Sequence, residues 1–418
     1  MTRSYVAEFV LPGHPDKLCD AIADALVEEA CRREKRSLCG VEVAIHRATV
    51  FITGRIACRE TESIPFDRIA RDVLRSAGYG KEWQPDPDSL RVEADLCLGP
   101  LDDGESEFRA VSDDQSIITG YAVNLPGTNY LPPEHWLAYR LSSAVEQLRM
   151  KQPELLLGPD GKVTVVYEED SERNRVVGFS TSLQQKVNGP AIELHRAVLS
   201  VLKNELAAVA EAIPGFDPAV PVEVHVNGAG NFEVGGPEGD NGLSGKKLVI
   251  DAYGPRVPIG GGALSGKDFF KADRAGAILA RRVAKAAVQT GAMRECTATV
   301  AFLPGARQAR LVSLRNDSGE YLDCTRWSAI SDRSLETIGE AYTGLHELVD
   351  VARYGHFTRP ELMWEQLTLT YSEVKALSDA RAFAEEEERM RQRRKEWFLK
   401  NNPTATPEEF EMVEAFGF

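Results

Sequence analysis

The chain has 418 residues, 43% of them hydrophobic, and a formal net charge of −15. This length and composition are sufficient for two or three packed domains, or for one large composite domain. The acidic balance argues against general nucleic-acid binding, which requires a basic surface. No apolar run approaches membrane-spanning length, so we expect no membrane or nucleic-acid partner.

Seven cysteines are scattered along the chain, and no two of them form a C-x-x-C pair. An odd and dispersed set of this kind favours neither a disulfide framework nor a zinc site. It is typical of reduced thiols, so we predict a cytoplasmic protein.

An amphipathic helix is predicted near the N-terminus, because Leu18, Ile22, Leu26 and Ala30 recur at every fourth position. Its first turn contains a proline, which suits helix entry. This helix follows the sequence Gly-His-Pro-Asp-Lys at residues 13–17.

Three aspartates of this helix, Asp16, Asp20 and Asp24, form one stripe at four-residue spacing. For Asp20 and Asp24 a solvated acidic face and a functional role are equally compatible with the pattern. Asp16 lies beside His14 and Lys17 at the helix entry, and we favour a metal-binding carboxylate next to a phosphate-binding imidazole and ammonium.

The remaining elements follow from period-2 and period-3.6 patterns and from turn residues. In the first 232 residues we predict paired strands in 41–57, a helix at 61–78, a strand at 89–98, a long polar loop at 99–116, a helix at 134–150, strands at 158–170 and 176–183, a helix at 190–212 and a strand at 222–226. After residue 271 we predict a helix at 272–290, strands at 296–303 and 309–315, a helix at 333–350, a charged helix at 380–403 and a short helical piece from 407.

Residues 228–274, called the cradle below, combine glycine with both signs of charge. Two glycine-dense loops, Gly235–Gly245 and Gly260–Gly266, flank an apolar segment that we predict to be a strand, Lys247–Tyr253. The cradle's charged residues include Lys246, Lys247, Lys267, Lys271, Asp240, Asp251, Asp268 and Asp273. Glycine lets backbone N–H groups approach an anion, and aspartates among lysines suggest Mg²⁺ held against phosphate oxygens.

The simplest alternative is a pair of flexible surface loops, but free loops do not require lysine and aspartate interleaved with glycine. The pattern is neither the P-loop G-x-x-x-x-G-K-[ST] nor G-x-G-x-x-G after a strand. The residues therefore predict a polyphosphate and metal site of another kind.

Three stretches resemble the S-adenosylmethionine synthetase (methionine adenosyltransferase) family: GHPDK at 13–17, the cradle over its whole length, and YGHF at 354–357. The likeness runs in order from Glu8 to Trp364. It implies an α/β fold of three similar domains in a pseudo-threefold arrangement, each a sheet with helices on one face. The expected bounds are 1–103, 104–232 and 233–366, with a charged helical extension at 367–418.

The resemblance also implies a reaction of one-carbon metabolism. The methionine sulfur attacks C5′ of ATP, and the triphosphate leaves and is cleaved to phosphate and diphosphate. Mg²⁺ and K⁺ are the implied cofactors. The implied assembly is a homodimer or a dimer of dimers, with active sites between subunits.

Carried over position by position, the family pattern assigns roles to sixteen residues. His14, Lys162, Lys247, Lys267 and Lys271 would be catalytic. ATP would be bound by His14, Asp160, Lys162, Asn231, Phe232, Asp240, Lys246, Lys247, Ala263 and Lys267. Asp16 and Asp273 would hold Mg²⁺, Glu42 would hold K⁺, and Arg55, Asp114, Asp240 and Lys271 would contact the acceptor.

Arg55 is the main departure from that pattern, because it stands where the family has the glutamate that binds the methionine ammonium. Arginine cannot accept a hydrogen bond from an ammonium and repels it. The acceptor is therefore methionine, with Glu60 or Glu62 compensating, or a different nucleophile that carries an acidic group.

A non-catalytic regulatory homologue, with residues 378–400 as a partner surface, is the third alternative. The tail can equally pack on its own subunit. A chain without activity would have no chemical need for the phosphate-binding set, which argues against this alternative.

Overall fold

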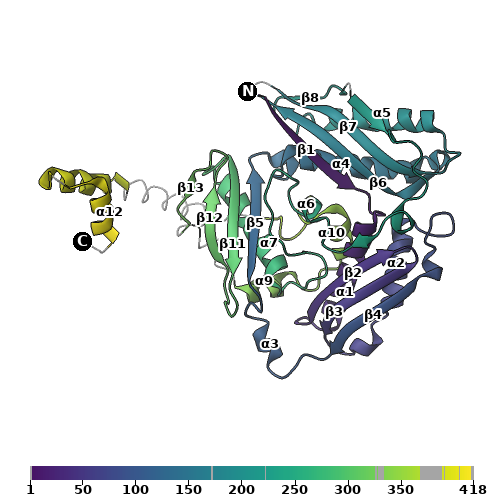
Figure 1. Ribbon diagram of the computed structural model, residues 1–418, viewed down its shortest axis with the longest axis horizontal. Helices are drawn as coiled ribbons and strands as arrows, with labels where there is room; N and C mark the ends of the chain where they lie inside the picture. The colour runs from purple at the N-terminus through teal and green to yellow at the C-terminus, as the bar shows by residue number, and fades with distance from the viewer. Residues whose placement is uncertain are drawn as a thin grey trace. The chain divides into compact units, whose positions relative to one another are not determined.

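The computed structural model describes residues 2–170, 173–221, 223–324, 327, 334–367, 388–389, 391–403 and 405–415 (Figure 1). The described residues up to 367, apart from Trp327, form one compact unit, and Trp327 and the residues from 388 belong to a second. The first unit is an α/β structure with three sheets, as predicted. No helix in the described ranges is long and apolar enough to cross a membrane.

The first sheet has five strands, and helices cover one of its faces. The sheet runs in the order β1-β6-β7-β8, and β9 also pairs with β7. The long helix α4 packs on β1 and β6, and α5 packs on α4. The bounds are β1 Arg3–Val10, β6 Leu157–Glu169, β7 Asn174–Gln185, β8 Phe216–Asp217, β9 Glu223–Val226, α4 Pro133–Lys151 and α5 Ala191–Val209.

The second sheet has the order β10-β2-β3-β4, with β3 and β4 parallel. Helix α1 packs on β2, and α2 packs on α1. The hairpin between β2 and β3 turns at Arg47, as predicted. The bounds are β10 Gly242–Leu243, β2 Leu38–His46, β3 Thr49–Ala57, β4 Arg91–Gly99, α1 Pro15–Arg33 and α2 Phe66–Ala77.

The third sheet has the order β13-β12-β11-β5, and α7 packs on β5 and β11. The bounds are β5 Ser116–Val123, β11 Glu295–Phe302, β12 Arg310–Arg315, β13 Tyr321–Leu322 and α7 Ala272–Gln289. Strands cross between the thirds of the chain, since β1 joins the sheet of residues 157–226 and β5 joins that of residues 295–322. The domain boundaries at 103, 232 and 366 therefore stay predictions.

Two predicted elements are wrong. The segment Lys247–Tyr253 is not a strand but contains a short helix, α6 (Leu248–Asp251), closed by N–H groups of Ile250 and Asp251 that donate to the Lys247 carbonyl. The helix expected at 333–350 is two helices, α9 (Leu335–Tyr342) and α10 (Leu348–Tyr354). Between them Gly344 has a φ of +88°, which is incompatible with a right-handed α-helix and interrupts the helical path.

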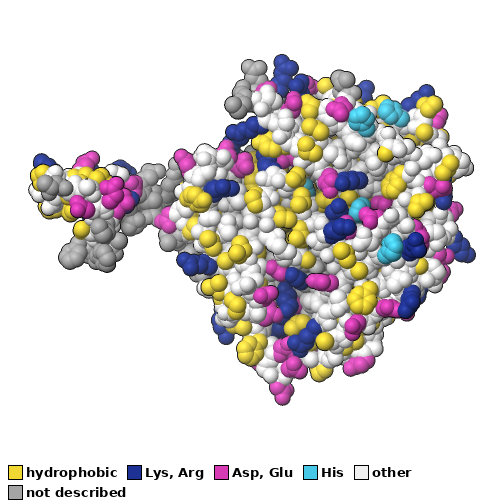
Figure 2. Space-filling model, in the orientation of Figure 1, with side chains coloured by type: hydrophobic (Ala, Val, Ile, Leu, Met, Phe, Trp, Pro, Cys, Tyr) yellow, Lys and Arg dark blue, Asp and Glu magenta, His cyan; other side chains and the backbone are white. Residues whose placement is uncertain are grey.

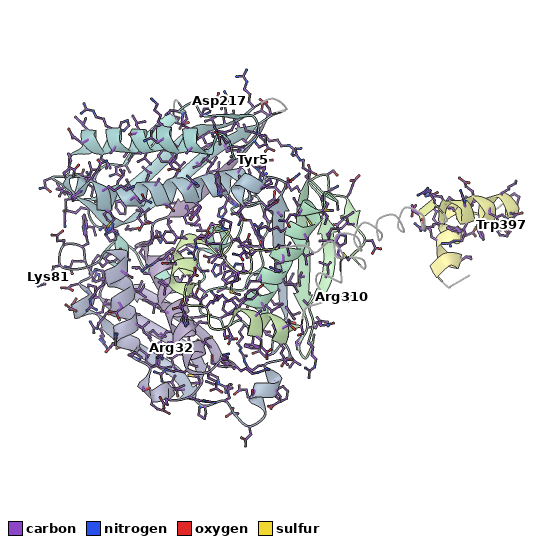
Figure 3. All side chains as sticks on the ribbon, turned by 180° about the vertical axis from the view of Figure 1, so that it is seen from behind. Tyr5, Arg32, Lys81, Asp217, Arg310 and Trp397 are labelled. Carbon is purple, nitrogen blue, oxygen red and sulfur yellow. The ribbon has the colours of Figure 1, made fainter. Side chains whose placement is uncertain are left out.

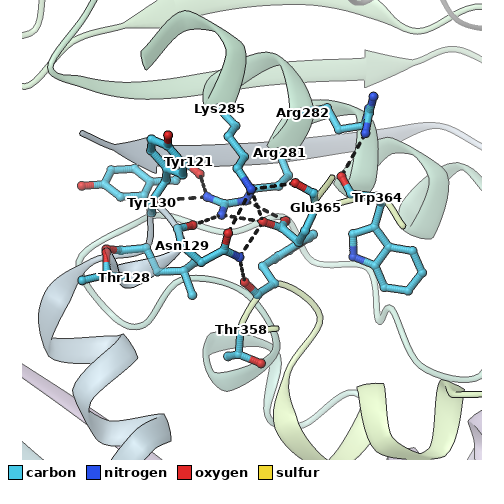
Figure 4. Close-up of polar contacts among 12 residues, drawn as sticks. Tyr121, Thr128, Asn129, Tyr130, Arg281, Arg282, Lys285, Thr358, Trp364 and Glu365 are labelled. Carbon is cyan, nitrogen blue, oxygen red and sulfur yellow. Dashed lines mark hydrogen bonds and ion pairs between the residues drawn. The ribbon is translucent and has the colours of Figure 1, made fainter. Parts of the chain in front are cut away.

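Helix α7 carries two buried cations that pair with a single buried carboxylate, that of Glu365. In Figure 4, Arg281 of α7 donates to both Glu365 oxygens at 2.9 Å, and Lys285 donates to the same carboxylate at 2.9 Å. Asn129 donates to Glu365 at 2.7 Å and accepts from Lys285. All four side chains are buried, so removing one partner leaves an uncompensated charge or polar group.

The polar loop predicted at 99–116 contains one short helix, α3 (Glu105–Phe108). In the second unit the predicted charged helix is helical at 391–401, and its part before residue 388 lies outside the described residues. The short C-terminal piece is α12 (Pro407–Ala415), and the rings of Phe398 and Phe410 lie 5.7 Å apart. Trp397, labelled in Figure 3, is 67% exposed.

Candidate functional site

His14 caps the N-terminus of α1 and faces the cradle. Its Nδ1 accepts the Asp16 N–H at 3.2 Å. Burial, followed by the charges of Lys247 and Lys162, lowers the pKa of His14 to about 3. The imidazole is therefore neutral at pH 7, and because Nδ1 accepts, the ring proton is on Nε2. That nitrogen can donate a hydrogen bond to a ligand oxygen.

A pocket of about 270 Å³, the His14 pocket, opens beside this ring. It is lined by His14, Pro15, Asp160, Gly161, Lys162, Ser182, Phe232, Val234, Gly235, Gly236, Gly239 and Asp240. Asp160 is buried and accepts the Gly236 N–H at 2.7 Å. Burial raises its pKa to about 6. Asn231 is exposed next to Phe232, and Ala263 lies against the loop at Gly245.

A second pocket, the Lys267 pocket, has a volume of about 550 Å³. It is lined by Gly40, Val41, Glu42, Thr53, Gly54, Asp113, Asp114, Gln115, Ser116, Lys267, Lys271, Ala272 and Asp273. Ten of the sixteen sequence-predicted site residues line one of these two pockets, and the other six line neither: Asp16, Arg55, Asn231, Lys246, Lys247 and Ala263. In Figure 2, basic, acidic and histidine side chains gather where the first and second sheets meet.

Lys162 and every cradle lysine with a predicted role contact a carboxylate. The pairs are Lys162–Glu8, Lys246–Asp16 at 3.6 Å, Lys247–Asp16 and Lys247–Glu8 at 3.8 Å, Lys267–Asp273 and Lys271–Asp113. These pairs are partly exposed, so each contributes little stability and can be exchanged. When a polyphosphate binds the lysines, it replaces their carboxylate partners, and these carboxylates can then bind a divalent cation.

Lys17 does not contribute to this surface, and its predicted phosphate-binding role is wrong. Its ammonium is fully buried, donates to Asp20 at 3.2 Å and pairs with Asp251 of α6. Although burial opposes it, the carboxylates of Asp251 and Asp20 raise the pKa of Lys17. The alternative of a solvated acidic face is also wrong, because Asp20 and Asp24 are completely buried.

Arg55, the predicted acceptor contact, does not carry an unopposed positive charge. Its guanidinium forms a bidentate ion pair with Glu105 of α3, in which both N···O distances are 2.8 Å. It also forms an ion pair with Asp102 at 3.3 Å. Arg55 with these two carboxylates has a net charge of −1, the charge of a single glutamate. The arginine therefore provides no reason to expect an acidic acceptor.

Sequence reasoning missed Glu8 and Arg109. Glu8 reaches Lys162 only because β1 pairs with β6, a register that no local pattern reveals. Arg109, the residue after α3 in the polar loop, forms a buried pair with Asp268. Asp268 also accepts the Cys39 and Phe270 N–H groups, so this cradle aspartate is structural.

Metal binding by protein side chains alone is not supported in the described part of the chain, which contains no group of three His, Cys, Asp or Glu residues able to hold an ion. Asp16 and Asp273 each present one carboxylate beside lysines. This donor set fits Mg²⁺, which binds one or two carboxylates and completes its octahedron with substrate phosphates and water.

Three layers of sheet and helix that meet at a lysine-rich, glycine-rich cradle define a polyphosphate-binding α/β protein. Comparison with known families agrees with this class. Models of the S-adenosylmethionine synthetase N-terminal, central and C-terminal domains match residues 2–96, 109–232 and 234–366. The chain belongs to the S-adenosylmethionine synthetase family.

Relatives named S-adenosylmethionine synthase match nearly their whole length. The protein of Deinococcus deserti is 30% identical over 404 residues, which cover 88% of this chain and 97% of the relative. That of Petrotoga mobilis is 29% identical over 87% and 96% of the two chains, and that of Clostridium tetani is 29% identical over 88% and 97%.

Proposed function

We propose that this protein transfers the adenosyl group of ATP to the sulfur of methionine, giving S-adenosylmethionine. The main supporting observation is a set of five lysines, Lys162 and four lysines of the cradle, each paired with an exchangeable carboxylate. Such an array suits a triphosphate that leaves as one unit. Family membership supports the same reaction.

The sulfur lone pair attacks C5′, and the C5′–O bond breaks with its electron pair going to the triphosphate. A thioether has no proton to lose, so no general base is needed for this step. The negative charge that develops on the leaving oxygen is stabilised by Lys162, Lys247 and Lys267, and the His14 Nε2–H donates to it. Water then cleaves the triphosphate to phosphate and diphosphate.

Adenine is proposed to occupy the His14 pocket against Phe232, with Asn231 and Asp160 beside it. Lys246 and Ala263 are proposed to flank the phosphates, and Asp240 to lie between the nucleotide and the acceptor. Mg²⁺ on Asp16 and Asp273 would supply further charge neutralisation of the phosphates. Glu42, exposed in the Lys267 pocket, is proposed to hold K⁺.

Methionine is proposed to bind near Lys271, Asp114 and Asp240, with Arg55 acting through its acidic neighbours. An ammonium then meets the net negative charge of Arg55 with Asp102 and Glu105, and Lys271 is available for the carboxylate. This arrangement needs no acceptor other than methionine.

We also propose a homodimer, or a dimer of dimers, that pairs the uncovered faces of the sheets. Large apolar side chains are exposed on these strands: Val6, Phe51, Ile117 and Val312 are 49%, 41%, 70% and 52% exposed. Glu8, Lys162 and Glu42 lie on uncovered faces as well, so such pairing brings pockets of two chains together.

All seven cysteines are unpaired thiols, which supports the proposed cytoplasmic location.

Mass spectrometry of the purified protein incubated with ATP, Mg²⁺, K⁺ and methionine tests the activity. The expected products are S-adenosylmethionine, phosphate and diphosphate in equal amounts. ATP binding without an adenosylated sulfonium would reject methionine as the acceptor.

Shared sites can be tested by mixing two inactive variants, Asp16→Asn and Lys267→Ala. If each site combines the His14 pocket of one chain with the Lys267 pocket of its partner, mixed dimers contain one intact site and activity returns to a quarter or less of the wild-type value. If both pockets of one chain form one site, the mixture stays inactive.

A further inference from the structure

The cradle contains the same tetrapeptide twice. Leu-Ser-Gly-Lys occurs at residues 243–246 and again at 264–267. The glycines have the same left-handed backbone, with φ of +74° at Gly245 and +84° at Gly266. Each glycine immediately precedes a lysine of the proposed phosphate site, so two equivalent turns present the phosphate-binding lysines.

Both tetrapeptides lie along one edge of β2. The Ser244 N–H donates to the Val43 carbonyl at 2.9 Å, and the Val41 N–H donates to the Gly266 carbonyl at 2.9 Å. The two turns therefore follow one another along the strand, and their glycine N–H groups point away from β2 toward α1.

The two glycine N–H groups donate hydrogen bonds to two aspartates of α1, Asp20 and Asp24. Gly245 donates to Asp20 Oδ1 at 2.8 Å, and Gly266 donates to Asp24 Oδ1 at 2.9 Å. Asp20 and Asp24 are four residues apart on one helix face, so their spacing of one turn matches the spacing of the two loops. Both carboxylates are fully buried.

Each carboxylate is also held by a buried cation. Asp20 Oδ2 accepts from Lys17 at 3.2 Å, and Asp24 accepts from two nitrogens of Arg274 at 2.8 and 2.7 Å. Charge-assisted bonds to a backbone N–H are stronger than neutral ones, and a carboxylate clamped by a cation cannot turn away. The peptide before each phosphate-binding lysine is therefore held in one orientation.

We propose that Asp20 and Asp24 are positioning residues that align the two Leu-Ser-Gly-Lys turns for triphosphate binding. Asp20 aligns Lys246 and Lys247, and Asp24 aligns Lys267. This role rests on the proposed function, since it assumes that the cradle binds the triphosphate of ATP. Neither aspartate touches the ligand, and each acts through a glycine N–H.

The test compares Asp20→Asn and Asp24→Asn with a matched control, Glu365→Gln. An asparagine offers one acceptor oxygen. At position 20 it cannot serve both Lys17 and Gly245, which bond to different oxygens of Asp20. At position 24 its NH₂ group must face either Arg274 Nη2 or the Gly266 N–H with Arg274 Nη1, all of which are donors, so the present contacts cannot all persist. Glu365 is an equally buried, ion-paired carboxylate, and none of its hydrogen bonds reaches the cradle turns. All three variants replace a buried carboxyl group by an amide, and only two of them disturb a loop contact.

Calorimetric titration with inorganic tripolyphosphate and Mg²⁺ gives the direct readout. We expect at least tenfold weaker binding in Asp20→Asn and Asp24→Asn, and binding within twofold of wild type in Glu365→Gln. In turnover, KM for ATP should rise in the two aspartate variants while KM for methionine stays within twofold. Folded aspartate variants that bind tripolyphosphate as well as wild type would overturn the positioning role alone. A wild-type protein that does not bind tripolyphosphate would overturn the proposed function as well.

A second measurement needs no variant. In the unmodified protein, residue-resolved hydrogen exchange should find the Gly245 and Gly266 amides at least a hundredfold more protected than the amide of Gly261, which is exposed in the same glycine-rich region. Equal exchange at all three glycines would overturn the proposal even if neither aspartate variant folds.

Discussion

Gly266→Ala is the substitution whose effect follows most directly from the geometry of the cradle. Gly266 has a φ of +84°, and a methyl group placed on it would overlap the Val41 carbonyl oxygen and lie 3.2 Å from the Ala23 methyl. The left-handed conformation costs about 1–2 kcal/mol for a residue with a side chain. Relieving the overlap costs about 1–3 kcal/mol more. Because the blocking atom belongs to the β2 backbone, the turn must move and carry Lys267 with it.

We therefore expect Gly266→Ala to lower the free energy of unfolding by about 2–5 kcal/mol and to raise KM for ATP. Urea unfolding monitored by tryptophan fluorescence and steady-state kinetics measure these two effects. Gly261→Ala is the matched control, because no atom lies within 4 Å of the added methyl, and its change should stay within about 0.5 kcal/mol. The reasoning is refuted if the two variants unfold at the same urea concentration and bind ATP equally.

Three further substitutions test separate parts of the molecule. The raised pKa of Asp160, about 6 against an ordinary 3.8, means that the folded protein binds more protons than the unfolded chain between these values. Ionised Asp160 therefore opposes folding above pH 6. We expect Asp160→Asn to raise the free energy of unfolding by about 1–3 kcal/mol at pH 8 and by little at pH 4. Urea titrations at both pH values measure this difference. Glu365→Ala leaves Arg281 and Lys285 buried without their carboxylate and should lower the free energy of unfolding by about 3–5 kcal/mol, measured in the same way; a loss below 1 kcal/mol would contradict this. Arg55→Ala frees the loop that carries Glu105 and should raise KM for methionine while KM for ATP stays unchanged. The expected rise is only about two- to fivefold, because the Arg55–Glu105 pair is partly exposed.

The sequence was sufficient for most of the helices and strands, whereas the roles of the site residues stay predictions. Period-3.6 apolar residues located α1 and α7, and period-2 patterns located β2, β3, β6 and β7. The apolar segment at 247–253 was misassigned because a short apolar run fits a buried strand or a buried helix equally well. The break at Gly344 was missed because the flanking residues on both sides keep a helical pattern.

Burial of the acidic stripe could not be read from the sequence. Asp20 and Asp24 have the spacing of a solvated helix face, and their burial depends on loops that arrive more than 220 residues later in the chain. The same limit applies to Glu8 and Arg55, whose partners are set by strand pairing and by the path of the 99–116 loop. Local patterns identify which residues carry charge, whereas tertiary packing decides which charges meet.

The central claim is that the C5′–O bond of ATP breaks during transfer to methionine. The most direct measurement uses ATP labelled with ¹⁸O at the oxygen that bridges C5′ and the α-phosphorus, with the products analysed by mass spectrometry. Attack at C5′ predicts that all of the label leaves with the phosphate and diphosphate products and that S-adenosylmethionine contains none. Label retained on a nucleoside product would mean that a P–O bond had broken instead, and would contradict adenosyl transfer by this cradle.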